Sequence, residues 1–446
     1  MSTSTVLATE ASVTKALAEG SPEDESSVPE MSRCPAASPT AWSDRLCRKV
    51  LESQLQHLRL GQLSVVDGCG RRSFGKPDNA ELASEVIVLS PKFYRSMLTG
   101  GALGAAEGFM RGEWSSDNLT DLFRILLRNR DVLSRFKSWL SPLFSGMNRI
   151  GHLLRDNSRI GSRRNISQHY DLGNEFFRLF LDPTMMYSSA WFPSPEASLE
   201  EGSIEKIDRI CRKLHLRSTD QVVEIGTGWG GFAMHAASQY GCHVTTTTIS
   251  EEQYRCAQQR IADAGLEHRI TVLKEDYRDL RGSYDKLVSI EMIEAVGDRH
   301  LPEYFSVCDR LLKPNGAMAI QAITMPEQRF AEYRRSVDFI QKYIFPGGFL
   351  PSVERMQQVV GAKTNLRMLD CTDFGHHYAR TLQIWNERFH NQLDEVRSQG
   401  FDERFIRMWK YYMHYCEAAF LERATGVVQL VWAKPDCELG QIPATS

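Results

Sequence analysis

An acidic residue followed by alternating glycines is the clearest chemical signal in the chain. The apolar run Val222–Ile225 contains Glu224 and leads into Gly226, Gly228 and Gly230, and an alanine-rich helical segment follows. Glycine has no Cβ, so the backbone at such a loop can approach a ligand closely. The first turn of a helix has N–H groups without partners inside the helix. The pattern therefore predicts a strand, a tight loop and a helix N-terminus that together hold a nucleotide-like cofactor.

Two cofactors fit this loop. Gly226, Gly228 and Gly231 match G-x-G-x-x-G, the dinucleotide fingerprint. Read instead as E-x-G-x-G-x-G, the same stretch is typical of S-adenosylmethionine methyltransferases. A glycine turn without any ligand is the third alternative. The next expected strand ends in Thr248-Ile249-Ser250 rather than in an acid, which weakens the dinucleotide interpretation.

Composition limits the classes of protein. The chain has 446 residues, a net charge of −3 and ten scattered cysteines without a Cys-x-x-Cys pair. This length predicts two or three domains, and the charge gives no overall signature of nucleic-acid binding. We expect reduced thiols in a cytoplasmic protein, no metal site and no nucleic-acid partner. No apolar stretch approaches the roughly 18 residues that a membrane span needs.

The first part of the chain divides into three segments. Residues 1–42 are rich in Ser, Thr, Ala, Pro and Glu and are expected to be a disordered tail. Residues 43–140 predict a small α/β domain without a catalytic cluster, with a hairpin at 63–75, a third strand at 86–89 and an aromatic loop at 108–114. Residues 141–168 form a basic linker, which an anionic membrane surface would attract, although an ordinary solvated linker fits equally well.

Residues 169–440 predict the larger domain, an α/β fold in which strands alternate with helices. The expected strands are 221–226, 242–249, 269–273, 285–290, 317–323, 366–375 and 426–432. Such alternation predicts a doubly wound, mostly parallel, seven-stranded sheet, and ligands bind such sheets at the carboxyl ends of the strands. Ser250 with Gln253 predicts a capping box at one of these ends.

Two aromatic segments flank the predicted sheet. Residues 169–202 are dense in aromatic residues and methionine, and residues 325–363 form a long apolar insertion after the fifth strand. Both suit the walls or the lid of an apolar pocket, and core packing is the alternative.

Several motifs agree with one family. They are His169–Asn174, Met186–Phe192, the Gly226 loop, Thr248–Ser250, Glu291–Gly297 and Tyr343–Gly348, in that order. Over residues 43–435 the chain closely resembles the cyclopropane-fatty-acyl-phospholipid synthases.

The resemblance implies a methyltransferase fold and a reaction on membrane lipids. The methyl group of S-adenosylmethionine is transferred to a cis double bond of a phospholipid acyl chain, and a carbocation forms. A bicarbonate ion accepts a proton from the new methyl group, and the cyclopropane ring closes. The family also implies peripheral association with a phospholipid bilayer, and a homodimer is possible.

Site residues are carried over from the family by motif. The cofactor residues would be Tyr187, Ser188, Gly226, Gly228, Gln253, Asp276 and Tyr277. The catalytic residues around bicarbonate would be Ser189, Glu294, Gln321, Ile323 through its backbone, and Tyr378. The best-known bacterial pattern has Cys at Ser189 and His at Gln321 and Ala295, but serine and glutamine can still donate hydrogen bonds to an anion. The aromatic rings that could face the carbocation are Tyr187, Trp191, Tyr343 and Tyr378.

Other functions remain open. Weaker binding of bicarbonate would allow a hydride shift and a methyl-branched or methylene product. An amine N-methyltransferase of related fold, a non-catalytic lipid-binding protein and a nicotinamide dehydrogenase are the further alternatives. The basic linker and the long apolar insertion favour a lipid substrate.

Overall fold

The computed structural model describes residues 41–76, 82–131 and 172–440. Nearly all of the predicted tail 1–42, the basic linker 141–168 and residues 169–171 of the aromatic segment lie outside the described residues. The last residue of the tail, Trp42, already begins a helix, α1 (Trp42–Leu55).

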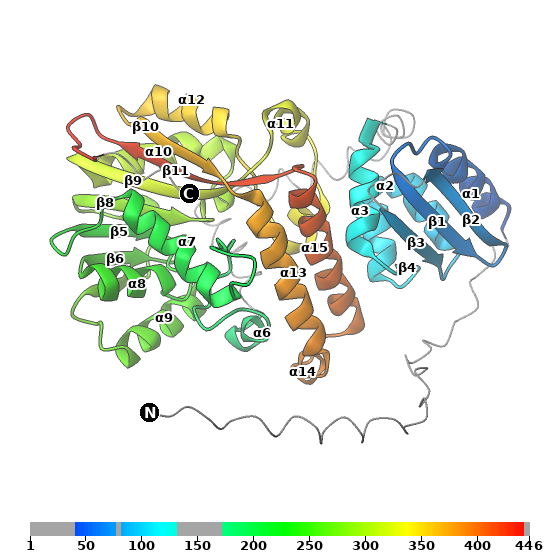
Figure 1. The fold of residues 1–446 in the computed structure, drawn as a ribbon, viewed down its shortest axis with the longest axis horizontal. Coiled ribbons are helices and arrows are strands. Elements are labelled where there is room, and N and C mark those ends of the chain that lie inside the picture. Colours follow the sequence, from blue (N-terminus) through cyan, green and yellow to red (C-terminus); the bar gives the residue numbers. More distant parts are fainter. Residues whose placement is uncertain (1–40, 77–81, 132–171, 441–446) are drawn as a thin grey trace, which may run out of the picture.

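A seven-stranded sheet forms the centre of the larger domain and confirms the predicted fold class (Figure 1). Its order is β10-β11-β9-β8-β5-β6-β7. The five strands from β9 to β7 are parallel, and β11 is antiparallel to both of its neighbours. The strands are β5 (Gln221–Ile225), β6 (His243–Thr247), β7 (Ile270–Leu273), β8 (Tyr284–Ile290), β9 (Leu312–Thr324), β10 (Arg367–Asp373) and β11 (Gly426–Ala433). Residues 314–316 lie within β9, where its pairing with β8 shifts register.

Helices cover both faces of this sheet. Buried side chains of α7 (Leu199–Lys213), α8 (Gly231–Tyr240) and α9 (Glu251–Asp263) share one apolar cluster with the sheet. Those of α10 (Leu301–Leu311) and α12 (Val353–Lys363) share the cluster on the opposite face. Short 3₁₀ turns follow two of the strands. The turn η1 (Tyr277–Asp279) comes after β7, and η2 (Ile293–Ala295) and η3 (Asp298–His300) come after β8.

The predicted lid insertion 325–363 contains three elements of different character. They are α11 (Glu327–Tyr333), the π-helical turn η4 (Ile340–Ile344) and α12. Met356 and Val360 of α12 are fully buried in the core beside α10, so α12 is a crossover helix of the sheet. Within the insertion, the residues that line the cavity end at Leu350.

The N-terminal domain contains the predicted hairpin, β1 (Gly61–Asp67) with β2 (Gly70–Lys76), and the predicted third strand, β3 (Ala83–Val88). The aromatic loop predicted at 108–114 is shorter than expected. Helix α2 (Lys92–Met110) includes its first three residues, residues 111–113 form a turn, and Trp114 begins a fourth strand, β4 (Trp114–Ser116). Trp114 is buried against Phe93 and Phe109, which fixes it in the core rather than in a loop.

Two long helices lie between the sheet and the N-terminal domain (Figure 1). They are α13 (Gly375–Asn391) and α15 (Glu403–Leu421), joined through α14 (Leu393–Ser398), and α6 (Asn174–Arg178) packs beside them. Helix α15 contacts α2 and α3 (Leu119–Arg128) of the N-terminal domain. Tyr411 packs on both Phe109 and Phe123, and Glu422 accepts hydrogen bonds from Arg124 and Arg128 at 2.8 Å each.

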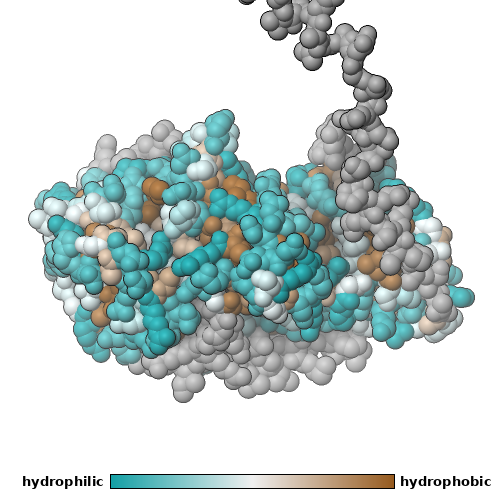
Figure 2. Space-filling model, turned by 90° about the horizontal axis from the view of Figure 1, so that it is seen from below, coloured by the Kyte–Doolittle hydropathy of each residue, from teal (hydrophilic) through white to brown (hydrophobic). Residues whose placement is uncertain are grey.

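Among the described residues, no helix is long and apolar enough to cross a bilayer. Figure 2 shows one face, on which hydrophilic side chains predominate and apolar ones gather in small separate groups.

Candidate active site

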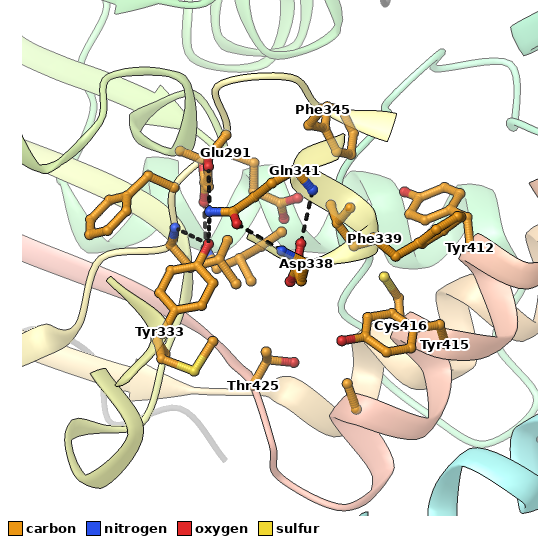
Figure 3. A pocket seen from close by; sticks show the side chains of 18 of the residues that line it. Glu291, Tyr333, Asp338, Phe339, Gln341, Phe345, Tyr412, Tyr415, Cys416 and Thr425 are labelled. Atoms are coloured by element: carbon orange, nitrogen blue, oxygen red, sulfur yellow. Dashed lines mark hydrogen bonds between the residues drawn. The ribbon is translucent and has the colours of Figure 1, made fainter. Parts of the chain in front are cut away.

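One large cavity lies at the carboxyl ends of the sheet strands. Its volume is about 1300 Å³. The Gly226 loop and the ends of β7 and β8 line one part. Phe339 and Phe345, which flank η4, line another part together with aromatic side chains of α15. Figure 3 shows Glu291 on one side of this space and Tyr412, Tyr415 and Cys416 of α15 on the other.

The glycine loop has the geometry of a ligand cradle. Gly226 and Gly228 have φ values of 103° and 53°, a region that favours glycine. A Cβ on Gly226 would lie 3.1 Å from the Met292 side chain, whereas a Cβ on Gly228 would meet nothing within 4 Å. The space above Gly228 is therefore open to the cavity, and α8 begins at Gly231 with its N–H groups directed toward the loop. These residues fit S-adenosylmethionine.

Gln253 lies at the next strand end, but its predicted capping box forms only in part. The Ser250 hydroxyl accepts a hydrogen bond from the Gln253 backbone N–H at 3.3 Å. The Gln253 side chain does not return a bond to Ser250, because its amide oxygen accepts from the Thr248 hydroxyl at 2.8 Å. This contact keeps Gln253 at the cavity wall.

Asp276 and Tyr277 follow β7. Both oxygens of Asp276 accept hydrogen bonds from the Arg278 guanidinium, at 2.8 and 2.7 Å. Tyr277 packs its ring against the edge of Tyr304.

Tyr187 and Ser188 enter from the segment before α7. The Tyr187 hydroxyl donates to that of Tyr412 at 3.0 Å, and the Lys206 ammonium donates to the Ser188 hydroxyl at 2.6 Å. All seven residues predicted to bind the cofactor thus line the same cavity, although they come from four separate segments.

The predicted bicarbonate residues divide into two groups. Glu294, Ile323 and Tyr378 line the cavity. Ser189 and Gln321 are fully buried behind its wall. The Ile323 backbone N–H, expected to hold the ion, donates instead to Glu294 at 2.6 Å.

Glu291, which was not among the predicted site residues, occupies the centre of this group. Its carboxylate accepts from the Ser189 N–H at 2.9 Å, the Gln321 amide at 2.7 Å and the Tyr378 hydroxyl at 2.8 Å. Every one of these donors was assigned to bicarbonate. The residues present therefore do not fit a bicarbonate ion at this point, because a protein carboxylate already takes the hydrogen bonds and a second anion beside it would be repelled. A signal was present in the sequence, since Glu291 directly follows a predicted parallel strand.

Buried charges surround Glu291. Burial raises the pKa of Glu291, while the positive charge of Lys206 and the three hydrogen bonds oppose this shift. Burial lowers the pKa of Lys206 to about 8, against the charges of Glu291, Asp182 and Glu224. Burial likewise raises the pKa of Glu224 to about 8, opposed by its hydrogen bond from Thr246.

Glu294 lies one short turn further along. Burial, followed by the negative charge of Glu291, raises its pKa to about 8. The like charge that acts on Glu294 is therefore that of Glu291. Among the described residues, Oε2 of Glu294 has no hydrogen-bond partner.

Two of the four aromatic rings predicted to face the carbocation are placed elsewhere. Trp191 stacks on His377 and is covered by the Arg209 guanidinium, 3.6 Å from its ring centre. The Tyr343 hydroxyl donates to Glu107 of the N-terminal domain at 2.7 Å. Tyr187 and Tyr378 do line the cavity, where Phe345, Tyr411, Tyr412 and Tyr415 join them.

Comparison with known proteins agrees with this geometry. The family described as mycolic acid cyclopropane synthetase matches residues 157–430, more than half of the chain. The chain belongs to this family. It is an S-adenosylmethionine-dependent methyltransferase of the cyclopropane synthase type, as the resemblance predicted.

Individual relatives extend the match. The chain is 44% identical over 328 residues to the tuberculostearic acid methyltransferase UfaA1 of Mycobacterium tuberculosis, covering 72% of this chain and 76% of the relative. It is 35% identical over 370 residues to the cyclopropane-fatty-acyl-phospholipid synthase of Escherichia coli, covering 80% and 89%. The solved structure of mycolic acid cyclopropane synthase CmaA1, complexed with SAH and CTAB, is 30% identical, with a TM-score of 0.57 over 61% of this chain and 98% of that one.

Proposed function

We propose that this enzyme methylates a cis double bond in the acyl chain of a phospholipid and closes a cyclopropane ring. The observation that carries the proposal is a single cavity that joins the glycine cradle to a long apolar, aromatic space. A relative named as a cyclopropane-fatty-acyl-phospholipid synthase covers most of the chain and supports the same substrate class.

The apolar part of the cavity suits an acyl chain. Beyond the aromatic residues that flank η4 and those of α15, it is lined by side chains of the N-terminal domain, among them Leu55, Phe93 and Leu122. An extended hydrocarbon gains free energy roughly in proportion to the apolar area that it buries. The N-terminal domain therefore supplies part of the lipid site, as well as packing against α15.

Arginine side chains suit the phosphate of a headgroup. Arg130 and Arg335 are exposed and also line the cavity, so they lie where it reaches the surface. Arg329 lies beside them and is held by a hydrogen bond to the Ala424 carbonyl at 2.7 Å. Guanidinium groups bind phosphate oxygens in a planar, two-point geometry. Together with the lipid cavity, they support a peripheral position on a phospholipid bilayer, which a vesicle flotation assay measures directly.

The residues of the cavity suit cation chemistry. S-Adenosylmethionine, when bound, supplies an electrophilic methyl group. The protein must hold the double bond close to that methyl group and keep water from the carbocation. The rings of Tyr187, Tyr378 and Tyr412 can stabilise the positive charge by about 0.5–2 kcal/mol each.

Two alternative products are supported by particular observations. The 44% identity to a tuberculostearic acid methyltransferase supports a methyl-branching reaction on the same acyl chain. An amine N-methyltransferase is supported by Asp338, which lies among Phe339, Tyr415 and Cys416 in Figure 3 and would attract an ammonium group. The homodimer stays a prediction, which light scattering of the purified protein tests.

The test is an assay with S-adenosylmethionine and vesicles of a cis-monounsaturated phospholipid. The expected product has gained one CH₂, lost its olefinic protons and shows upfield ring protons in the NMR spectrum. The same gain in mass with a branched methyl or a remaining alkene would reject ring closure. Binding of the cofactor without formation of any lipid product would favour the amine N-methyltransferase instead.

A further inference from the structure

The protein carries its own carboxylate at the point where an external anion was expected. We propose that Glu291 is the catalytic proton acceptor of the ring-closing step, so that turnover needs no bicarbonate. This inference rests on the proposed lipid methylation and assigns the base of that reaction.

The geometry of Glu291 leaves room for a proton. A carboxylate offers about four acceptor positions, and the described residues fill three of them. Oε1 accepts from Ser189 and Gln321, whereas Oε2 accepts from Tyr378 alone. Glu291 lines the cavity, so the remaining position on Oε2 is available to a group inside it.

The backbone at Glu291 supports a functional role. Its φ is 47°, in the left-handed region, where a residue with a Cβ costs about 1–3 kcal/mol. Its N–H donates to the Gln321 carbonyl at 2.8 Å, which holds this conformation at the end of β8. A strained residue aimed into a cavity is typical of sites where function, rather than stability, selects the side chain.

The charges near Glu291 suit a base. Lys206 of α7 is buried and also lines the cavity, close enough for its positive charge to favour the ionised form of Glu291. The pKa of Glu291 is nevertheless raised by burial, and a base whose pKa approaches the working pH accepts protons most effectively.

The step balances without another reactant. The π electrons of the double bond form the bond to the methyl carbon, and the electrons of the former sulfur–methyl bond stay on sulfur. The C–H bonding pair of the new methyl group then forms the third ring bond to the cationic carbon. The proton passes to Glu291, whose carboxylate becomes a neutral carboxyl group and returns the proton to solvent before the next turnover.

Two substitutions separate a base from a structural residue. E291Q keeps the volume but cannot accept the proton, so we expect turnover to fall about 100-fold or more, with no response to bicarbonate. E291G suits the left-handed backbone and leaves a space ringed by the Ser189, Gln321 and Tyr378 donors. We expect E291G to lose turnover equally in bicarbonate-depleted buffer and to regain it by about tenfold or more as bicarbonate is added.

The controls use the same assay. Wild-type turnover should be unchanged between depleted buffer and millimolar bicarbonate, and E303Q, an exposed carboxylate on α10, should match wild type. Calorimetric titration with S-adenosylhomocysteine checks that each variant is folded and binds the cofactor. A wild-type enzyme that needs added bicarbonate, or an E291Q variant with full turnover, would overturn the assignment.

A binding measurement keeps this result separate from the lipid reaction. In a titration with carbon-13-labelled bicarbonate followed by NMR, E291G should bind the ion, and wild type and E291Q should not. If wild type forms no lipid product, the proposed function fails while this titration still decides whether Glu291 occupies the ion site. Binding of bicarbonate by the wild-type protein would reject the assignment of Glu291 to the ion site.

Discussion

Glu291 and Glu294 place two carboxyl groups in one cavity, Glu291 directly after β8 and Glu294 within the turn η2 that follows. Three donors and the charge of Lys206 favour the ionised form of Glu291. Glu294 accepts one backbone N–H, and burial together with the charge of Glu291 raises its pKa to about 8. The surroundings therefore favour protonation of Glu294, where the charge of Glu291 adds to the effect of burial, and favour a negative charge on Glu291, where Lys206 and three donors oppose burial.

This protonation should appear in the pH dependence of stability. The folded-state pKa of Glu294 is raised from 4.5 to about 8, so its contribution to stability is complete below pH 4.5 and is lost as the pH rises to about 8. One such group changes the free energy of unfolding by up to about 1.4 kcal/mol per pH unit. We expect E294Q to reduce the dependence of stability on pH by the contribution of Glu294, measured by urea denaturation of the cofactor-free protein across that interval.

The exposed E303Q variant should keep the wild-type slope. Part of the slope should persist in E294Q as well, because burial also raises the pKa of Glu224 to about 8. An E294Q profile that superimposes on the wild-type profile would mean that Glu294 is ionised in the folded protein.

The glycine cradle can be tested with two matched alanine substitutions. Gly228 and Gly265 both have positive φ, and a Cβ at either would meet nothing within 4 Å. Each alanine should cost about 1–2 kcal/mol of stability through backbone strain. Only Gly228 lines the cavity, so G228A alone should weaken binding of S-adenosylhomocysteine, by about tenfold or more, in a calorimetric titration. Equal affinities in the two variants would show that the loop does not hold the cofactor.

Local sequence patterns predicted most of the sheet. The β-branched run at 242–249 and the apolar run at 317–323 became β6 and β9, because strands buried on both faces need such side chains. Patterns failed where tertiary contacts decide the structure. Trp114 begins a strand because β3 is available to pair with it, and Met356 places α12 in the core because α10 lies opposite.

The candidate site shows the same limit. Motifs located the glycine loop and Glu294, since these are local in the chain. The role of Glu291 depends on Ser189, Gln321 and Tyr378, which come from three other elements and converge only in the folded protein. Likewise, Trp191 and Arg209 are separated in the sequence, so no local motif predicts the contact of the Arg209 guanidinium with the tryptophan ring.

The arginines at the surface end of the cavity lead to a prediction about vesicles. R335E places a negative charge where a lipid phosphate is expected, and it should lower turnover on anionic vesicles more at low salt than at high salt, because surface charges are screened. The control is K363E, which makes the same change on an exposed residue of α12 outside the cavity. Equal turnover of both variants at low salt would remove Arg335 from headgroup binding.

Lys206 should set the acidic limit of activity. If Glu291 must be ionised, turnover rises with pH as Glu291 loses its proton. The positive charge of Lys206 lowers the pKa of Glu291, so this rise occurs at lower pH. K206M keeps most of the volume but removes the charge, so the pKa of Glu291 rises. We therefore expect the acidic limb of the kcat/KM profile to move to higher pH, with about a tenfold loss of rate on that limb for each unit of displacement.

A second buried lysine of α7 provides the control for this prediction. Lys213 donates to Asp370 and Thr372 of β10, at 2.7 and 2.9 Å, and does not line the cavity. K213M also removes a buried charge and should lower stability, but it should leave the acidic limb in place. If K206M and K213M shift the profile equally, the effect is a general consequence of losing charge. If only K206M shifts it, while both variants still bind S-adenosylhomocysteine, Lys206 acts through Glu291.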